Sequence, residues 1–233
     1  GDIYALARTR DGFLWLATDA GLMRFDGARF ELPDVKQFPV PAGESVSCLF
    51  VDRQGALWAG TARGGLLRRN LGGQFQELGP GGLLGEGDKF VSLAEDGEGA
   101  LWAATARHGV FCCREGKWQV LASANDLESP VGLDHVLADA RGHTWVISAG
   151  ELKVWNREQG RFSTLAAPSS QTVTELAAGH DGSLWAGTLA KSPYPGGRVF
   201  QFRAGQWSEP LEPYPWPQAE WLSCPVALLE DTL

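Results

Sequence analysis

Two stretches of the sequence, Asp52-Arg-Gln-Gly-Ala-Leu-Trp-Ala-Gly-Thr61 and Asp96-Gly-Glu-Gly-Ala-Leu-Trp-Ala-Ala-Thr105, are nearly identical and lie 44 residues apart. The phrase recurs around three further tryptophans, so five copies follow one another at intervals of 43, 44, 43 and 40 residues. The anchoring tryptophans are Trp15, Trp58, Trp102, Trp145 and Trp185, each three residues after a glycine: Gly12, Gly55, Gly99, Gly142 and Gly182. A period in the low forties is typical of a propeller blade or of a long helical repeat.

Each copy has the pattern of short strands separated by turns. Apolar and polar residues alternate before the turn, as in Val46–Val51, which is the period of a strand. The Asp52–Gly55 segment that follows has turn chemistry, because glycine accepts the positive φ of a tight hairpin and aspartate bonds turn amides. Two more glycine-containing turns complete four strands per copy. The sequence therefore predicts an all-β fold, a β-propeller of four-stranded antiparallel blades of about 43 residues each.

We expect the chain to form a single domain, and the positions of the repeat divide this domain into blades. Residues 225–233 match the first strand of a sixth copy, with Leu228 and Asp231 at repeat positions. Propellers have four to eight blades, so we expect five blades and one strand of a larger, seven-bladed ring. A five-bladed ring closed by the extra strand is the alternative. The expected blades are 1–32, 45–78, 89–122, 132–166 and 172–211, with the next beginning at 225–233.

Charge and composition narrow the range of possible partners and locations. The formal net charge is −8 and no basic run is present, which argues against nucleic acid and anionic membranes as partners. No apolar stretch approaches the ~18 residues of a membrane span. The sequence lacks a signal peptide and does not begin with Met, so we expect a processed product or a fragment.

The two quoted stretches resemble the two-component regulator propeller repeat, D-x-x-G-x-L-W-x-G-T-x-x-G-L-x-R. The first copy, Asp11–Gly27, is similar to the N-terminal blade of that family, in which an R-F-D-G phrase often closes the third strand. The resemblance covers the whole chain. The fourth and fifth copies depart from it: Thr144 replaces the leucine, Gly179 replaces the turn aspartate, and Ser192–Gly197 lengthens a turn.

The resemblance implies a ligand-binding sensor segment that is periplasmic or extracellular. Such segments precede a transmembrane helix and an output domain such as a histidine kinase, a DNA-binding regulator or a diguanylate cyclase, and many are associated with polysaccharide sensing. We therefore expect a non-enzymatic input domain without a cofactor. Its expected partners are an unknown small molecule or oligosaccharide, the missing blades and output domain of the same polypeptide, and a second copy in a homodimer of the full-length protein.

Blade geometry predicts where a ligand binds. The Asp-x-x-Gly hairpins open on one face, and the turns between second and third strands share the other face with the connections between blades. The variable sequences lie on this second face, where binding residues are normally placed. Long connections there are Pro33–Glu44, Gly79–Lys89, Ser123–His135 and Pro210–Pro225. The candidate ligand-binding residues are Asp19, Arg63, Arg107, His108, Lys191, Tyr194, Trp216 and Trp221. The last two, outside the repeat pattern, either stack on a sugar or peptide or cover a blade edge.

Other chemistry is not indicated. The turn aspartates Asp52, Asp96, Asp139 and Asp231 are isolated, whereas calcium needs six to eight oxygens, so we expect turn caps and no metal. His143 and His180 fall inside turns, and only His108 and His135 are placed to share the variable face. No hydrolase, metalloprotease or phosphate-loop motif is present, and no catalytic residue is expected. We expect buried free thiols at Cys48, Cys112, Cys113 and Cys224, with the redox compartment left open.

Two alternatives remain. One is a secreted enzyme of the streptogramin-lyase type, whose blades have a similar rhythm and which uses an axial His with acidic residues and a divalent metal. The first-copy phrase and the lack of a convergent His and carboxylate set in the sequence favour the sensor. The other is a protein–protein interaction platform, which would bind a partner protein and no small molecule.

Overall fold

The computed structural model describes residues 1–33, 38–41, 43–84, 87–123, 127, 133–139, 141–168, 172–179, 181–189 and 197–209. These residues form five four-stranded antiparallel sheets and one short 3-10 helix, η1 (Gly81–Leu83). The strands are β1 (Ile3–Arg8), β2 (Leu14–Thr18), β3 (Gly21–Phe25), β4 (Phe30–Glu31); β5 (Val46–Val51), β6 (Leu57–Thr61), β7 (Leu66–Arg69), β8 (Phe75–Glu77); β9 (Phe90–Glu95), β10 (Leu101–Thr105), β11 (Gly109–Arg114), β12 (Lys117–Ala122); β13 (Leu133–Ala138), β14 (Thr144–Ser148), β15 (Glu151–Asn156), β16 (Arg161–Leu165); and β17 (Thr172–Ala178), β18 (Leu184–Leu189), β19 (Gly197–Arg203), β20 (Gln206–Ser208).

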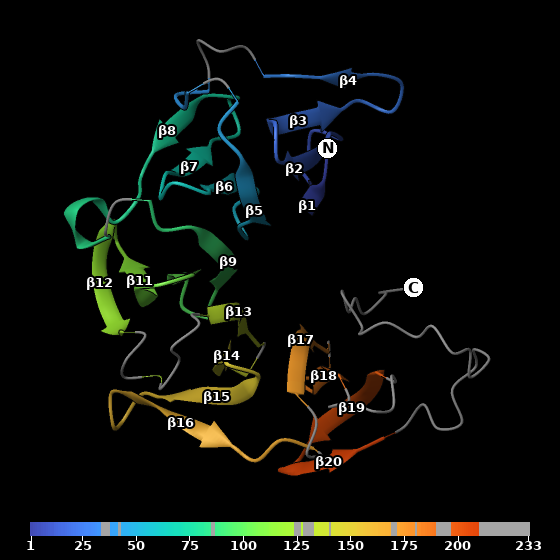
Figure 1. The fold of residues 1–233 in the computed structure, drawn as a ribbon, viewed down its shortest axis with the longest axis vertical. Coiled ribbons are helices and arrows are strands. Elements are labelled where there is room, and N and C mark those ends of the chain that lie inside the picture. Colours follow the sequence, from blue (N-terminus) through green and yellow to red (C-terminus); the bar gives the residue numbers. More distant parts are fainter. Residues whose placement is uncertain are drawn as a thin grey trace.

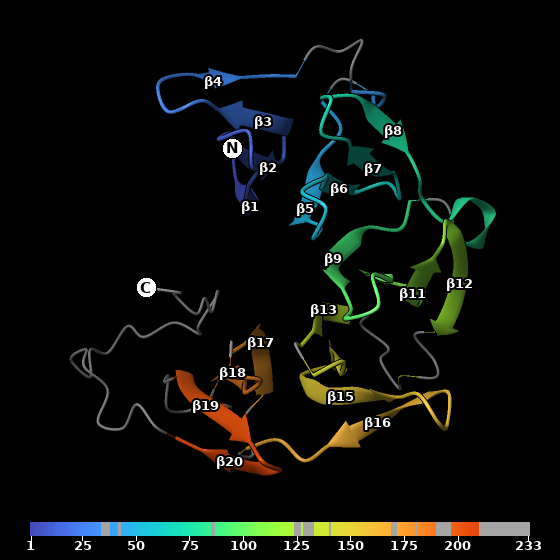
Figure 2. The same cartoon turned by 180° about the vertical axis from the view of Figure 1, so that it is seen from behind.

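The sheets follow one another along an arc, as the blades of a propeller do (Figure 1). Strands β1, β5, β9, β13 and β17 lie nearest the centre and the fourth strand of each sheet lies at the rim, an order that the reverse view also shows (Figure 2). The predicted all-β propeller is confirmed. The expected strand at 225–233 lies outside the described residues, so the number of blades in the complete ring stays a prediction.

The core lies between blades, where the faces of successive sheets pack against each other. Trp15 of the first blade packs with Leu57 and Leu67 of the second in one buried cluster. The approach is close enough to require glycine at Gly60, where a Cβ would come within 2.6 Å of both Cys48 Sγ and Phe90 Cβ. Burial of the repeat tryptophans therefore depends on the next blade, which is why the motif repeats at the blade period.

The recurrent aspartates cap turns, as predicted. Asp96 accepts the backbone N–H groups of Glu98 and Ala100 at 2.9 Å on Oδ1, and its Oδ2 accepts the indole N–H of Trp102. Asp139 makes the same three bonds in its own blade, and Asp52 makes two of them, from the Ala56 backbone N–H and the Trp58 indole N–H. In the first blade Thr9 substitutes for the aspartate, since its Oγ1 accepts from Trp15 Nε1 at 2.9 Å.

Arginines in these turns connect successive blades. Arg10 donates to the carbonyl of Arg53 at 3.0 Å, and Arg141 donates to that of Asp181 at 3.3 Å. Arg53 donates to the carbonyls of Gly97 and Asp96 and pairs with Glu95. These bonds join one hairpin turn to the next around the face that carries the Asp-x-x-Gly turns, which we call the hairpin face.

Candidate functional site

The opposite face is formed where turns between second and third strands meet the segments that lead into the inner strands. Backbone hydrogen bonds make this contact in several blades: Ala62 N donates to Ser45 O at 3.0 Å, and Ala106 N donates to Lys89 O at 2.9 Å. We call this the loop face. The loop face arises because the inner strand of each blade begins at the same end of the propeller at which the fourth strand of the preceding blade finishes.

A buried carboxylate organises the loop face of the third blade. Asp88 has no exposed surface and accepts the backbone N–H groups of Arg107 and His108, each at 3.0 Å. Its Oδ2 also lies 2.7 Å from Nδ1 of His108. When the imidazole is neutral, this contact places the proton on Nδ1 and leaves Nε2 as an acceptor. The His108 side chain is 43% exposed, so the ring is held firmly yet open to a ligand.

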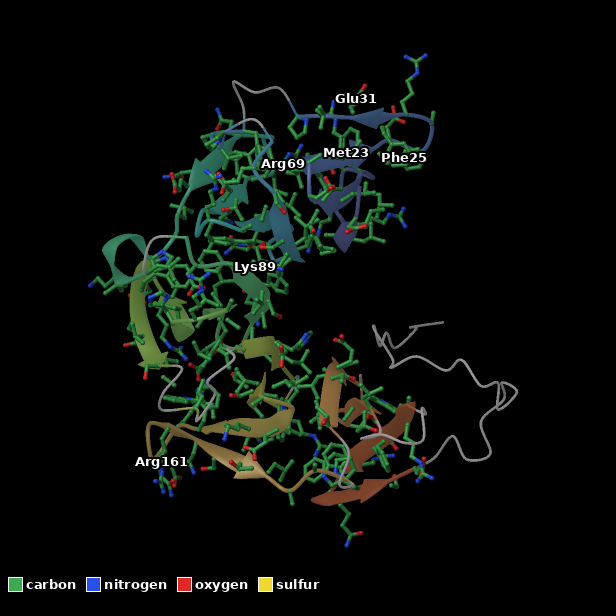
Figure 3. All side chains as sticks on the ribbon, viewed as in Figure 1. Met23, Phe25, Glu31, Arg69, Lys89 and Arg161 are labelled. Atoms are coloured by element: carbon green, nitrogen blue, oxygen red, sulfur yellow. The ribbon has the colours of Figure 1, made fainter. Side chains whose placement is uncertain are left out.

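A lysine and a tyrosine meet near the axis on the same side. Lys89 precedes β9 and projects toward β1 (Figure 3), where its Nζ lies 5.3 Å from the centre of the Tyr4 ring. This is within the range of a cation–π contact. Asp88 and Lys89 are consecutive residues just before β9, and we refer to the dyad of Asp88 with His108 and the pair of Lys89 with Tyr4 together as the polar surface at the axial end of the loop face.

A second histidine pairs with a carboxylate between neighbouring inner strands. His135 Nδ1 on β13 lies 3.4 Å from Glu175 Oε1 on β17. Burial lowers the pKa of His135 to about 4 and raises the pKa of Glu175, so both groups are shifted toward their neutral forms. Burial also raises the pKa of Asp134, which precedes His135. The inference from sequence that no His and carboxylate converge is thus corrected: both residues occupy the position ten before a repeat tryptophan, and adjacent blades bring them together.

These groups do not build a metal centre. Within the part of the chain that the structure describes, no three His, Cys, Asp or Glu side chains are placed to hold one ion. His143 contacts Asp139 at 2.9 Å inside its turn, where half of its side chain is exposed, as expected of a surface turn residue.

The structure describes half of the candidate ligand-binding residues predicted from sequence. Asp19, Arg63, Arg107 and His108 are exposed in loop-face turns. The other four candidates lie outside the described residues: Lys191, Tyr194, Trp216 and Trp221. The sequence reasoning missed Tyr4, Asp88 and Lys89. Their only signal was polarity at the start of an inner strand, which is also where solvent-facing residues are expected.

The described cysteines are free thiols. Cys48 and Cys112 are buried and Cys113 is partly buried. Burial raises the pKa of Cys48 to about 12 and that of Cys112 to about 11, so both remain protonated near neutral pH. His180 and Cys224 lie outside the described residues.

Helices are scarce, and within the described ranges none is long and apolar enough to cross a membrane.

Residues 1–20 and 41–63 match the family model described as Two component regulator propeller. No curated protein matches the sequence.

Solved structures share the fold. The extracellular domain of a putative hybrid two component system from B. thetaiotaomicron is 18% identical with a TM-score of 0.67, over 88% of this chain and 29% of that chain. A second such domain from the same organism is 16% identical with a TM-score of 0.65, over 89% and 27%. Streptogramin B lyase is 15% identical with a TM-score of 0.62, over 86% and 68%. This chain thus spans less than a third of the length of these two extracellular domains.

Proposed function

We propose that this chain, which carries the repeat of the two-component regulator propellers, is part of the extracellular or periplasmic input domain of a transmembrane signal-transduction protein. In this role it binds a small molecule or oligosaccharide and has no catalytic activity of its own. The output, a kinase or another effector, belongs to other parts of the polypeptide. The repeat itself supports the proposal, together with the likeness to extracellular domains of hybrid two component systems.

The polar surface at the axial end of the loop face is the proposed ligand site. His108 presents Nε2 from a ring fixed by the buried Asp88, so little conformational entropy is lost when a ligand binds it. Lys89 and Tyr4 add an ammonium donor and an aromatic ring within one surface. The arrangement suits a polar ligand with several hydrogen-bonding groups and a ring or chain that contacts the tyrosine.

Ligand-dependent thermal stabilisation tests this proposal. A panel of oligosaccharides and small polar metabolites is screened against the wild-type protein, and every compound that raises Tm is tested again with Lys89→Ala and His108→Ala. We expect the rise in Tm to disappear in both variants, because binding to the native state is what stabilises it. Lys117→Ala, an exposed lysine on β12, is the matched control and should retain the full rise. Equal stabilisation of all four proteins would place the ligand elsewhere.

A secreted lyase is the second candidate, because His135 and Glu175 do converge and streptogramin lyases share the fold. A structure of virginiamycin B lyase from Staphylococcus aureus is described with quinupristin, which makes that compound the direct substrate to try. Under the sensor proposal, incubation with quinupristin and divalent metal gives no turnover. Turnover that disappears in His135→Ala would replace the sensor with the lyase.

A further inference from the structure

Three cationic residues gather around the buried Asp88 on the loop face. Lys89 follows it in the sequence, and the backbone N–H of Arg107 donates to its carboxylate at 3.0 Å. Arg63 lies in the second-blade turn that packs against the same segment, because a Cβ on its neighbour Gly64 would come within 3.2 Å of the Asp88 carbonyl oxygen. Turns from two successive blades therefore bring three positively charged residues to one place.

These cations have no acidic partner within the part of the chain that the structure describes. Arg63, Lys89 and Arg107 are exposed, and no ion pair or side-chain hydrogen bond reaches their charged groups. The carboxylate of Asp88 is already engaged by two backbone N–H groups and by the ring of His108. Three cationic groups thus stand against one buried carboxylate that pairs with none of them.

Arginines at the hairpin face are used differently. Arg53 pairs with Glu95 at 3.1 Å, and Arg69 pairs with Asp11 at 3.0 Å. Carboxylates are plentiful in a chain whose net charge is −8, and at the hairpin face they compensate these guanidinium groups. The loop face of the second and third blades lacks such compensation and carries a local excess of positive charge.

Other carboxylates of the loop face belong to other parts of the arc. Asp2 and Asp19 lie at the first blade, Glu44 precedes the first strand of the second, and Asp134 lies on β13 of the fourth. Among the described residues, no ion pair joins any of these four to the three cations. The cations are therefore available to an anion from outside the chain.

The inner strand of the first blade adds an aromatic surface beside these charges. A register shift between Ile3 and Ala5 leaves Tyr4 as an extra residue, a β-bulge that re-aims its side chain. Tyr4 is 47% exposed, and its ring centre lies 5.3 Å from Lys89 Nζ. The apolar face of a sugar ring can pack on such an amphipathic ring while the sugar hydroxyls stay free to hydrogen-bond. Aromatic surface next to positive charge therefore favours an acidic sugar over an acidic peptide.

We propose that the ligand of the loop-face site is an acidic oligosaccharide, whose negative groups pair with Arg63, Lys89 and Arg107. One of its sugar rings packs on Tyr4, and Nε2 of His108 accepts a hydrogen bond from a hydroxyl. Guanidinium groups bind oxyanions through two parallel hydrogen bonds, and an ammonium group adds a point charge. This inference rests on the proposed function and adds to it the charge of the ligand. The negative groups are uronic acid carboxylates or sulfate esters, which share this chemistry.

Isothermal titration calorimetry of the full chain with four probes tests the proposal. Trigalacturonic acid carries uronates, its trimethyl ester has the same rings without charge, sucrose octasulfate carries sulfates, and tri-aspartate carries carboxylates without a sugar. We expect at least one acidic sugar to bind several-fold more tightly than both the ester and tri-aspartate. Its affinity should fall as NaCl is raised, because salt screens exposed charges. The tighter acidic sugar identifies the source of the negative groups.

The same titrations can overturn the proposal. It fails if neither acidic sugar binds more tightly than the ester, because charge then contributes nothing. It also fails if tri-aspartate binds as tightly as the acidic sugars, which would assign the surface to an acidic peptide. Tyr4→Leu should weaken the binding of the acidic sugar and leave that of tri-aspartate unchanged, since only the sugar packs on the aromatic ring.

Substitutions place the acidic sugar on the surface. Arg63→Gln and Arg107→Gln should each weaken its binding several-fold, and both variants should fold because the two side chains are exposed. Lys117→Gln removes an exposed cation at the start of β12, near the hairpin face, and should leave the affinity unchanged. Unchanged affinity in both arginine variants overturns the proposal. A neutral oligosaccharide whose rise in Tm disappears in Lys89→Ala and His108→Ala would uphold the loop-face site and overturn only its preference for an acidic ligand.

Discussion

The indole Nε1 of Trp102 donates a hydrogen bond to Oδ2 of Asp96 at 3.0 Å, and both side chains are almost completely buried. The same bond joins Trp58 to Asp52 at 2.9 Å. One carboxylate thereby holds the amides of a hairpin turn and fixes the tryptophan that packs on the next blade. The six-residue spacing of Asp and Trp in the repeat is the sequence record of this bond.

Removing that carboxylate should be costly. Asp96→Ala leaves the Trp102 indole N–H and two turn amides without acceptors, and a buried unsatisfied group costs about 1–3 kcal/mol. We expect a loss of about 3 kcal/mol in the free energy of unfolding, measured by urea denaturation. Glu98→Ala is the control, because Glu98 is an exposed member of the same ion-pair network and its loss should matter far less. Equal losses in the two variants would contradict a role for the buried bond.

Acid should destabilise the protein through the same group. Burial alone would raise the pKa of Asp96, but hydrogen bonds from Trp102, Ala100 and Glu98 and the charge of Arg114 outweigh it and lower the pKa. Its contribution is therefore complete above the unfolded-state value of 3.8 and is lost as pH falls through the lower folded-state pKa. Below pH 4, wild type should lose stability more steeply than Asp96→Asn, as urea midpoints across a pH series will show.

His135 should produce a separate pH dependence at milder acidity. Burial lowers its pKa from 6.5 to about 4, so between these values the unfolded chain binds a proton that the folded protein does not. Stability therefore decreases as the pH is lowered through this window, by on the order of 1–2 kcal/mol from pH 7 to pH 5. The raised pKa of Glu175 opposes this change. Urea denaturation at both pH values should show a smaller difference for His135→Gln than for wild type, and identical differences would exclude the assignment.

Arg53 should hold the second blade to the third. Its guanidinium pairs with Glu95 and donates to the Gly97 and Asp96 carbonyls, whereas Arg10 makes a single such bond to the next turn. We expect Arg53→Ala to lower the free energy of unfolding by about 1 kcal/mol and to speed amide hydrogen exchange in the turn 96–99. Arg10→Ala should have a smaller effect, and exchange at 96–99 should not change in it.

Replacing leucines at the same position of two repeats should lower the free energy of unfolding by different amounts, because the two side chains are buried to different extents. Leu6 and Leu176 lie nine residues before a repeat tryptophan, yet Leu6 is 59% exposed and Leu176 is 3% exposed. Leu176→Ala should therefore destabilise by about 2–5 kcal/mol through loss of buried surface and cavity formation. Leu6→Ala should cost less than about 0.5 kcal/mol. Thermal and urea unfolding measure both losses. If Leu6→Ala and Leu176→Ala lose similar amounts of unfolding free energy, Leu6 is covered in solution.

Much of the architecture follows from local pattern. The alternation in Val46–Val51, the turn chemistry of Asp52–Gly55 and the recurrence of both at the blade period were sufficient to predict four-stranded blades in a propeller. Local pattern also predicted the capping role of Asp52, Asp96 and Asp139, which the hydrogen bonds confirm. These features are readable because each depends on residues only a few positions apart.

The sites depend on contacts between blades. His135 and Glu175 look unrelated in the sequence, and Asp88 looks like any polar residue before a strand. A cleft beside Trp58 has walls from two blades, among them Trp58 and Arg68 of the second blade and Leu101 and Cys113 of the third. Periodicity in one dimension predicts which elements form, since strands and turns are local. Which side chains meet across a junction is decided only when successive sheets pack face to face and bring together residues some 40 positions apart.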